Sequence, residues 1–200
     1  YILPTKEGRW AVVFGNGDFT GTTSKLFMVD IADPATETRI IDTGSGTGLS
    51  SPAVLLNGLG QFESAYAGDV DGNMWRFHYN GTSMTSYKVF TTLSGQPITA
   101  APTVGFNGIL SKYMLYFGTG RYYKIGDNLI GGQRQSLYAV PDMGPGGTPA
   151  TRSNLLEKRM DTIYDVGAES RTISTSNPDW STQLGWYVDL DFVSGSRDER

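Results

Sequence analysis

The chain carries one sequence pattern three times, at an interval of about 50 residues. Each copy has a proline, a short loop, an apolar stretch and a turn rich in glycine, and the copies lie at 3–17, 51–69 and 101–121. A unit this short cannot bury its own apolar surface and must stack on its neighbours. The repeat therefore restricts the chain to a modular architecture.

A second apolar stretch follows each copy, at 25–31, 73–79 and 136–142. Large apolar residues recur there at every other position, which is typical of half-buried strands. The first two repeats add a further strand each, at 38–43 and 87–92, and the residues around the next proline supply a fourth. Four strands per repeat of this length are the signature of a β-propeller blade.

The repeat predicts an all-β, quinoprotein-like propeller fragment of about three to four four-stranded antiparallel blades, because closed propellers have roughly four to eight. We expect the blades at 1–47, 48–96 and 97–165, with residues 166–200 starting another through a strand at 185–192. The segment 153–165 satisfies helical as well as strand spacing, and we favour a strand that pairs with 171–176.

The composition agrees with this fold and excludes several kinds of site and partner. The chain has 26 glycines among its 200 residues, which suits short strands joined by tight turns. It has no cysteine, which excludes disulfides, thiolate nucleophiles and zinc–thiolate sites. Its net charge is −4 with scattered Lys and Arg, which argues against a nucleic-acid or anionic-membrane partner. No apolar run approaches the roughly 18 residues of a membrane span.

The stretch "YAGDVDGNMWRFHY" (66–79) fits either a metal loop or a turn. Asp69, Asp71 and Asn73 stand at every second position, as oxygen ligands do in an EF-hand loop. Asp71-Gly72 between alternating strands is also a strong signal for a type I′ hairpin, which needs positive φ at both residues. The other two repeats have longer connections at this place, so we expect a turn, with the metal site as the alternative.

Six ordered motifs carry a resemblance to a known family: "VVFGNG", "GLSSP", "YAGDVDGNMWRF", "GQPITAAP", "YFGTGRY" and "NPDWSTQLGWYVDL". They resemble the carboxy-terminal propeller of the PilC/PilY family of type IV pilus tip-associated adhesins. The resemblance implies a non-enzymatic module for pilus biogenesis and tip-associated adhesion that promotes pilus extension and surface attachment. It implies a place at the cell surface, at the pilus tip and associated with the outer membrane. The implied partners are pilin or minor pilins, a host or abiotic surface, and the remaining blades of a full-length propeller.

By resemblance, the calcium loop of the family corresponds to "LNGLGQFESA" (56–65). Asn57 and Glu63 fall where its first and last acidic ligands belong, but Leu59 replaces an intermediate Asp. One carboxylate and one amide give too little charge for a tight Ca²⁺ site. We therefore expect no metal or other cofactor, with Asn57, Gln61 and Glu63 as the alternative ligand set.

The alternative function is a dehydrogenase propeller that holds pyrroloquinoline quinone against a stacking aromatic, and the candidate aromatics are Trp10, Trp75, Trp180 and Trp186. Trp75 lies within an alternating strand, so we expect it to pack between blades. A Ser-His-acid triad would need the single histidine, His78, which lies in the same strand, and the chain has no G-x-S-x-G motif. No catalytic residue is predicted.

Overall fold

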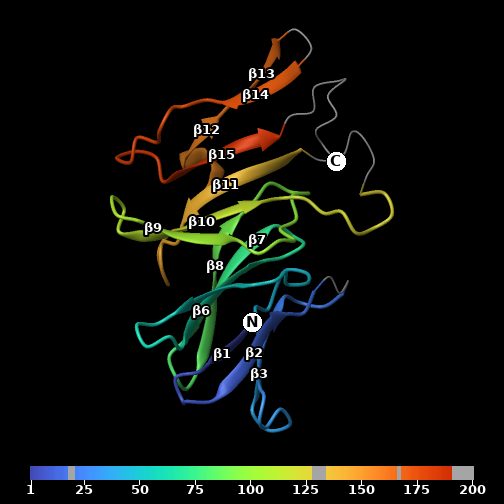
Figure 1. Ribbon diagram of the computed structural model, residues 1–200, viewed down its shortest axis with the longest axis vertical. Coiled ribbons are helices and arrows are strands. Elements are labelled where there is room, and N and C mark those ends of the chain that lie inside the picture. The colour runs from blue at the N-terminus through green and yellow to red at the C-terminus, as the bar shows by residue number, and fades with distance from the viewer. Residues whose placement is uncertain (18–20, 128–133, 166–167, 191–200) are drawn as a thin grey trace.

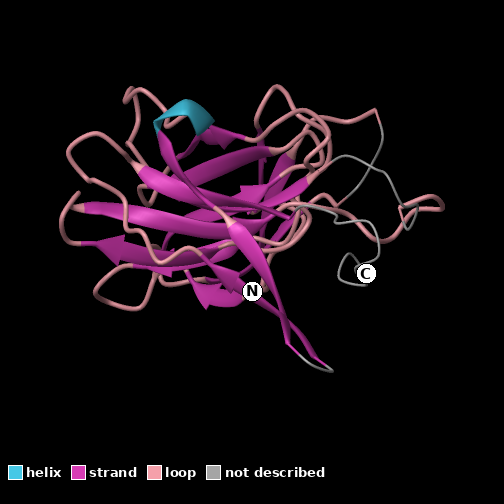
Figure 2. Cartoon of the chain, turned by 90° about the horizontal axis from the view of Figure 1, so that it is seen from above, coloured by secondary structure: helices cyan, strands magenta, loops and turns pink. Residues whose placement is uncertain are grey.

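A computed structural model of the chain describes residues 1–17, 21–127, 134–165 and 168–190. Within them, three β-sheets follow one another along the chain and stack face to face, from the first repeat at the bottom of Figure 1 to the third at the top. Among the described residues, the only helical element is a 3₁₀ turn at Arg152–Asn154, and strands make up the rest of the regular structure (Figure 2). The predicted all-β class is confirmed.

The first two sheets are four-stranded antiparallel meanders. The first consists of β1 (Ile2–Pro4), β2 (Trp10–Gly15), β3 (Lys25–Asp30) and β4 (Thr38–Asp42). The second consists of β5 (Ala53–Leu56), β6 (Phe62–Gly68), β7 (Asn73–Tyr79) and β8 (Met84–Thr91). Buried and partly exposed residues alternate along β3, as expected for a strand with one face in the core, whereas β6 is buried along nearly its whole length.

The third sheet has five strands in the order β12-β15-β11-β10-β9. They are β9 (Thr103–Asn107), β10 (Lys112–Gly118), β11 (Gln135–Pro141), β12 (Leu155–Lys158) and β15 (Gly185–Leu190). The expectation that 185–192 starts a further blade is wrong for the described residues, because β15 pairs antiparallel with β11. Strand β12 pairs parallel with β15, so this sheet is not purely antiparallel. The residues 191–192 lie outside the described residues.

A long insertion therefore separates the third and fourth meander strands of the last sheet. It contains the 3₁₀ turn η1 (Arg152–Asn154), strand β12, and a hairpin of β13 (Met160–Asp165) and β14 (Ala168–Ile173). The hairpin confirms that part of 153–165 is a strand paired with the segment around 171–173. Figure 2 shows this two-stranded hairpin projecting from the stack.

The core consists of two apolar layers, one on each side of the second sheet. Trp75, Phe77 and Tyr79 of β7 point into the first layer, where they join buried side chains of the first sheet such as Leu26 and Met28. Met74 lies in the second layer, with buried side chains of the third sheet. The predicted packing of Trp75 between sheets is confirmed, since only 5% of this residue is exposed.

The connection between β6 and β7 is a turn, as expected, but of another type. The Gly72 amide donates to the Asp69 carbonyl at 3.1 Å, and the Asp69 amide donates to the Asn73 carbonyl at 2.9 Å. Gly72 has φ +82°, whereas Ser111 is the only non-glycine with positive φ among the described residues. Asp71 therefore does not belong to a positive-φ pair, and the turn is a three-residue loop closed by a left-handed glycine.

Two connections, 43–52 and 92–102, lead from the last strand of one sheet to the first strand of the next. Each connection passes close to a glycine of the preceding sheet. A Cβ on Gly15, for example, would overlap the carbonyl oxygens of Leu49 and Ser50 in the first connection. A Cβ on Gly68 would overlap Ile98 in the same way. The glycines that end β2 and β6 thus allow the connections to pass close to these strands.

Candidate functional site

The alternative calcium ligands, Asn57, Gln61 and Glu63, lie at the hairpin between β5 and β6. The Asn57 side-chain oxygen accepts hydrogen bonds from the amides of Leu59 (2.9 Å) and Gln61 (3.0 Å). The Asn57 side-chain amide donates to the Gln61 side-chain oxygen at 3.0 Å. Both side chains therefore hold the loop together, while Glu63 lies beyond it in β6. Within the described ranges, no group of three or more acidic or histidine side chains could hold a metal ion.

Asp69, the first residue of the ambiguous turn, is fully buried and accepts hydrogen bonds from several donors. Oδ1 accepts from the Asn73 backbone amide at 2.8 Å, and the Asn73 side-chain amide reaches both oxygens at 3.1 and 2.9 Å. Oδ2 also accepts from Trp75 Nε1 at 2.7 Å and from Ser24 Oγ at 3.2 Å. The carboxylate is fully engaged within the protein.

These contacts join two sheets. Ser24 directly precedes β3 of the first sheet, whereas Asn73 and Trp75 belong to β7 of the second. Gly46, in the connection after β4, lies so close that a Cβ there would overlap Asp69 Oδ2. Asp71, by contrast, is exposed and accepts one hydrogen bond, from Thr47 Oγ1 at 3.0 Å. The turn therefore separates a structural carboxylate from a surface carboxylate.

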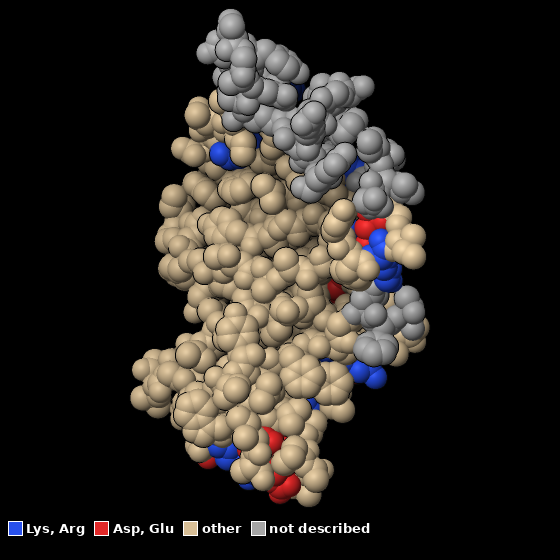
Figure 3. Space-filling model, turned by 45° about the vertical axis from the view of Figure 1, so that its right-hand side comes forward, with Lys and Arg blue, Asp and Glu red and all other residues tan. Residues whose placement is uncertain are grey.

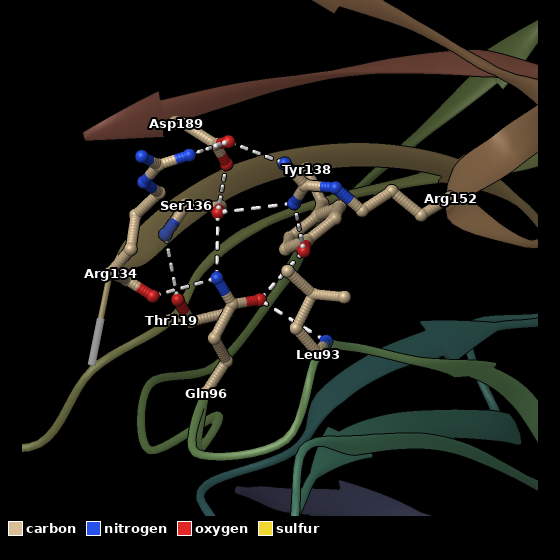
Figure 4. A network of polar contacts seen from close by, with 8 residues as sticks. All are labelled: Leu93, Gln96, Thr119, Arg134, Ser136, Tyr138, Arg152 and Asp189. Atoms are coloured by element: carbon tan, nitrogen blue, oxygen red, sulfur yellow. Dashed lines mark hydrogen bonds and ion pairs between the residues drawn. The ribbon is translucent and has the colours of Figure 1, made fainter. Parts of the chain in front are cut away.

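A second polar network joins the connection before the third sheet to that sheet (Figure 4). Gln96 is buried, and its side-chain amide donates to Ser136 Oγ at 2.8 Å. Its side-chain oxygen accepts from the Tyr138 hydroxyl at 2.6 Å. Ser136 Oγ donates in turn to Asp189 Oδ1 of β15 at 2.6 Å. Figure 4 shows these side chains converging between the connection and the third sheet.

Arg152 of η1 completes this network. Its guanidinium bonds Asp189 Oδ2 at 2.5 Å and the Tyr138 hydroxyl at 2.8 Å, and it lies 3.6 Å from the centre of the Tyr187 ring. Burial alone would raise the pKa of Asp189, but the bonds from Arg152 and Ser136 hold it below its usual value. Arg152 thereby fixes the insertion to the sheet.

A third cluster surrounds Asp142, which follows β11. Its carboxylate accepts from the Tyr66 hydroxyl (2.7 Å), Arg76 (2.7 Å) and the Tyr87 hydroxyl (2.9 Å), all from the second sheet. Burial would raise the pKa of Asp142, but these bonds and the Gly144 amide lower it below the ordinary value. Burial and the nearby Asp142 charge raise the pKa of Tyr87 to about 12.

His78 has a structural place next to this cluster. Its Nδ1 lies 3.1 Å from Ser64 Oγ, which also accepts a bond from Arg76 at 3.1 Å. Burial, with the charge of Arg76, lowers the pKa of His78 below its usual value. The acid of this cluster, Asp142, bonds Arg76 rather than His78, so the described contacts do not form a Ser-His-acid relay.

A hollow of about 400 Å³ opens where the turns and connections of the three sheets meet. Its lining residues are Phe14, Gly15, Gly17, Leu49, Ser50, Ser51, Val70, Ile98, Thr99 and Tyr123. None of these residues is charged. A polycarboxylate quinone needs cationic or metal partners, so this lining does not fit that cofactor.

The candidate tryptophans do not share this hollow. Trp75 is buried between sheets, and Trp10 is 56% exposed on the outer face of the first sheet. Trp186 lies on the third sheet, where its ring centre is 6.4 Å from that of Tyr116. On the face in Figure 3, the blue and red side chains of the described residues lie at the lower end, along the right-hand edge and near the upper left, so they do not form one continuous basic patch.

Sequence reasoning missed the three carboxylate networks. The contacts that join different sheets or the insertion link residues far apart along the chain, such as Tyr66 and Asp142 at 76 residues, and the period of a strand does not predict such contacts. A signal did exist in the acidic residues at strand ends, because a carboxylate beside an apolar strand needs partners when it is buried.

Comparison with known protein families gives a consistent result. A family model described as the PilY1 beta-propeller domain matches residues 2–90. The type IV pilus biogenesis factor PilY1 of Pseudomonas aeruginosa strain PAO1 is 32% identical over 242 residues, which cover 95% of this chain. A PilY1 homolog from Xylella fastidiosa is 28% identical over 95% of the chain. The chain spans 21% of the length of the first relative and 15% of the second.

A solved structure supports the same comparison. The crystal structure of the Pseudomonas aeruginosa PilY1 C-terminal domain matches with a TM-score of 0.80 and 26% sequence identity. The match covers 98% of this chain and 50% of that chain. The fold of the three stacked sheets is thus that of a β-propeller. Among the described residues, no helix has the length and apolar character needed to cross a membrane.

Proposed function

Because this chain belongs to the PilY1 family of β-propeller domains, we propose that it is a non-enzymatic module of a type IV pilus biogenesis factor. The observation that carries the proposal is the match to PilY1 along nearly the whole chain, in sequence and in fold. Its task is to promote pilus extension and surface attachment from the pilus tip and the outer membrane. Its partners are pilin or minor pilins and a host or abiotic surface.

The described side chains support a binding role over catalysis. The three buried carboxylates, Asp69, Asp142 and Asp189, are each surrounded by donors from the protein itself. A general acid or base must instead reach a substrate proton. Asp69 and Asp142 join neighbouring sheets, and Asp189 joins β15 to β11 and to Arg152 of the insertion.

The exposed apolar face of the first sheet is the evidence for the remaining blades as a partner. Phe14, Phe27 and Ile40 form one row across three strands, and the Phe14 and Phe27 rings stack at 5.2 Å. Ile2 and Trp10 lie on the same face, exposed by 66% and 56%. The inner face of this sheet is already buried, so the sheet is apolar on both sides and needs a second cover. We propose a further blade as that cover.

The proposal is tested in cells that make the full-length protein. Removing residues 1–200 should abolish surface pili, counted by electron microscopy, and surface motility. A matched strain with Leu59→Ala, which changes one exposed side chain, should keep both. Normal pilus numbers in the deletion strain, with the truncated protein present, would refute a role of this domain in pilus biogenesis.

The dehydrogenase alternative has its own test. Pyrroloquinoline quinone added with calcium should leave the tryptophan fluorescence of the chain unchanged, because no charged side chain lines the hollow. Saturable quenching would show that a cofactor site exists and would favour the enzyme.

A further inference from the structure

The hollow between the three sheets has the properties of a binding site that the pilus assignment does not require. Its volume of about 400 Å³ lies within the roughly 300–1,000 Å³ of small-ligand sites. Side chains from all three sheets or their connections line it, including Leu49, Val70 and Ile98. None of its lining residues is charged, and the large side chains among them are aliphatic or aromatic, so ions and charged groups find no partner there.

The polar groups of the hollow are few. The Thr99 hydroxyl already donates to the Gly120 carbonyl at 2.7 Å. The Ser50 hydroxyl is enclosed and has no hydrogen-bond partner among the described residues. Because the Ser50 Oγ is enclosed by protein atoms, it does not face the space that a ligand would occupy. A sugar ring, with many hydroxyls, would leave most of them without partners against Leu49 and Ile98.

The loop 121–127, beside the hollow, is held in one conformation by hydrogen bonds and exposes apolar side chains. Asp127 accepts hydrogen bonds from the amides of Tyr123 (3.0 Å) and Lys124 (2.7 Å) and from Arg121 at 2.9 Å. The residues held this way include Tyr122 and Ile125, which are 73% and 108% exposed. Tyr123 belongs to this loop and also lines the hollow, so the two surfaces are continuous.

Exposing tyrosine and isoleucine side chains to water is unfavourable. Such side chains on a loop held by hydrogen bonds are typical of protein interfaces, where aromatic residues act as anchors. We propose that the hollow and the loop 121–127 form one recognition site for an uncharged peptide segment of another protein. One large apolar side chain of that segment enters the hollow and packs against Leu49, Val70 and Ile98. Tyr122 and Ile125 cover the flanking residues.

The test uses the chain as it is and fluorescein-labelled, end-blocked pentapeptides with a central Leu, Phe, Asp or Lys between Gly and Ser residues. Fluorescence anisotropy should show saturable binding of the Leu and Phe peptides, at least about tenfold tighter than the Asp and Lys peptides. Ser51→Trp places an indole at the exposed rim of the hollow and should weaken this binding about tenfold or more. Ser94→Trp, on the other connection and away from the lining, is the matched control and should bind as the parent does.

Ile125→Ser with Tyr122→Ser should weaken the same peptides without changing the melting temperature, since both side chains are exposed. The proposal is wrong if no peptide binds, if Ser51→Trp and Ser94→Trp bind alike, or if a neutral disaccharide competes better than unlabelled Leu peptide. None of these outcomes depends on pilus assembly, so this test and the test in cells can fail independently.

Discussion

Replacing Asp69 by asparagine tests whether the turn between β6 and β7 is a structural junction. The change keeps the shape of the side chain but turns one carboxylate oxygen into an amide donor. In the parent, Oδ1 accepts from the Asn73 amide, while Oδ2 faces Trp75 Nε1 and the Asn73 side-chain amide. If the side-chain oxygen of the new asparagine accepts the bond from the Asn73 backbone, its NH₂ group takes the place of Oδ2. That group then faces two other donors, Trp75 Nε1 and the Asn73 side-chain amide, which lie 2.7 and 2.9 Å from Oδ2 in the parent.

The expected loss follows from those two bonds. A hydrogen bond to a charged group contributes roughly 1.5–3 kcal/mol, so losing two costs about 3–6 kcal/mol. A domain of this kind has a total stability of about 5–15 kcal/mol, so the variant should be severely destabilised or unfolded. The loss should affect the junction of the first two sheets, because Ser24 of the first sheet bonds the same oxygen.

Urea unfolding followed by tryptophan fluorescence measures this loss. Asp71→Asn is the matched control, with the same chemical change two residues away on an exposed side chain, and should shift stability by less than about 0.5 kcal/mol. If Asp69→Asn unfolds within about 1 kcal/mol of Asp71→Asn, the carboxylate does not hold the sheets together and our reading of the turn is wrong.

Four further predictions concern packing, pH and calcium. Trp75→Ala should cost roughly 3–5 kcal/mol by urea unfolding, and a melting temperature within a degree or two of the parent would contradict a core role. Gly15→Ala should strongly destabilise the chain, because its Cβ would meet backbone oxygens, whereas Gly58→Ala meets nothing within 4 Å and should be tolerated. The pKa of Asp142 is lowered in the folded state, so the stability that its carboxylate contributes is present above about pH 4 and is lost as the pH falls below it. The difference in unfolding free energy between the parent and Asp142→Asn should therefore shrink from pH 5 to pH 3, and a constant difference would refute this. Millimolar calcium should leave the melting temperature of the parent unchanged, and Leu59→Asp should create calorimetric binding; micromolar binding by the parent would show a working calcium loop.

The sequence predicted the strands whose alternation and turn residues are local. The repeat predicted equivalent apolar stretches within 3–17, 51–69 and 101–121, and each of these copies contains the second strand of its sheet, β2, β6 or β10. The alternation of Trp75 and Phe77 also predicted which side chains share a layer. These features depend on the two-residue period of a strand, which any sequence displays directly.

The order of the third sheet could not be predicted in this way. The period of a strand says nothing about which edge it joins, so β15 was assigned to a new blade, whereas it pairs with β11 across an insertion. Arg152 and Asp189, which bond across that insertion, are 37 residues apart. The type of the turn at Asp71 was wrong for another reason, because an Asp-Gly pair fits both two-residue and three-residue loops.

The most direct test of the central claim is surface piliation of a Pseudomonas aeruginosa strain that lacks PilY1 and receives a chimera. In the chimera, this chain replaces the matching segment, which is 21% of the Pseudomonas protein. Pilus counts by electron microscopy should rise towards those of the parent strain, and the same chimera with Asp69→Asn should fail while Asp71→Asn succeeds. A chimera that is made and exported at the normal level yet restores no surface pili would contradict a role of this propeller in type IV pilus biogenesis.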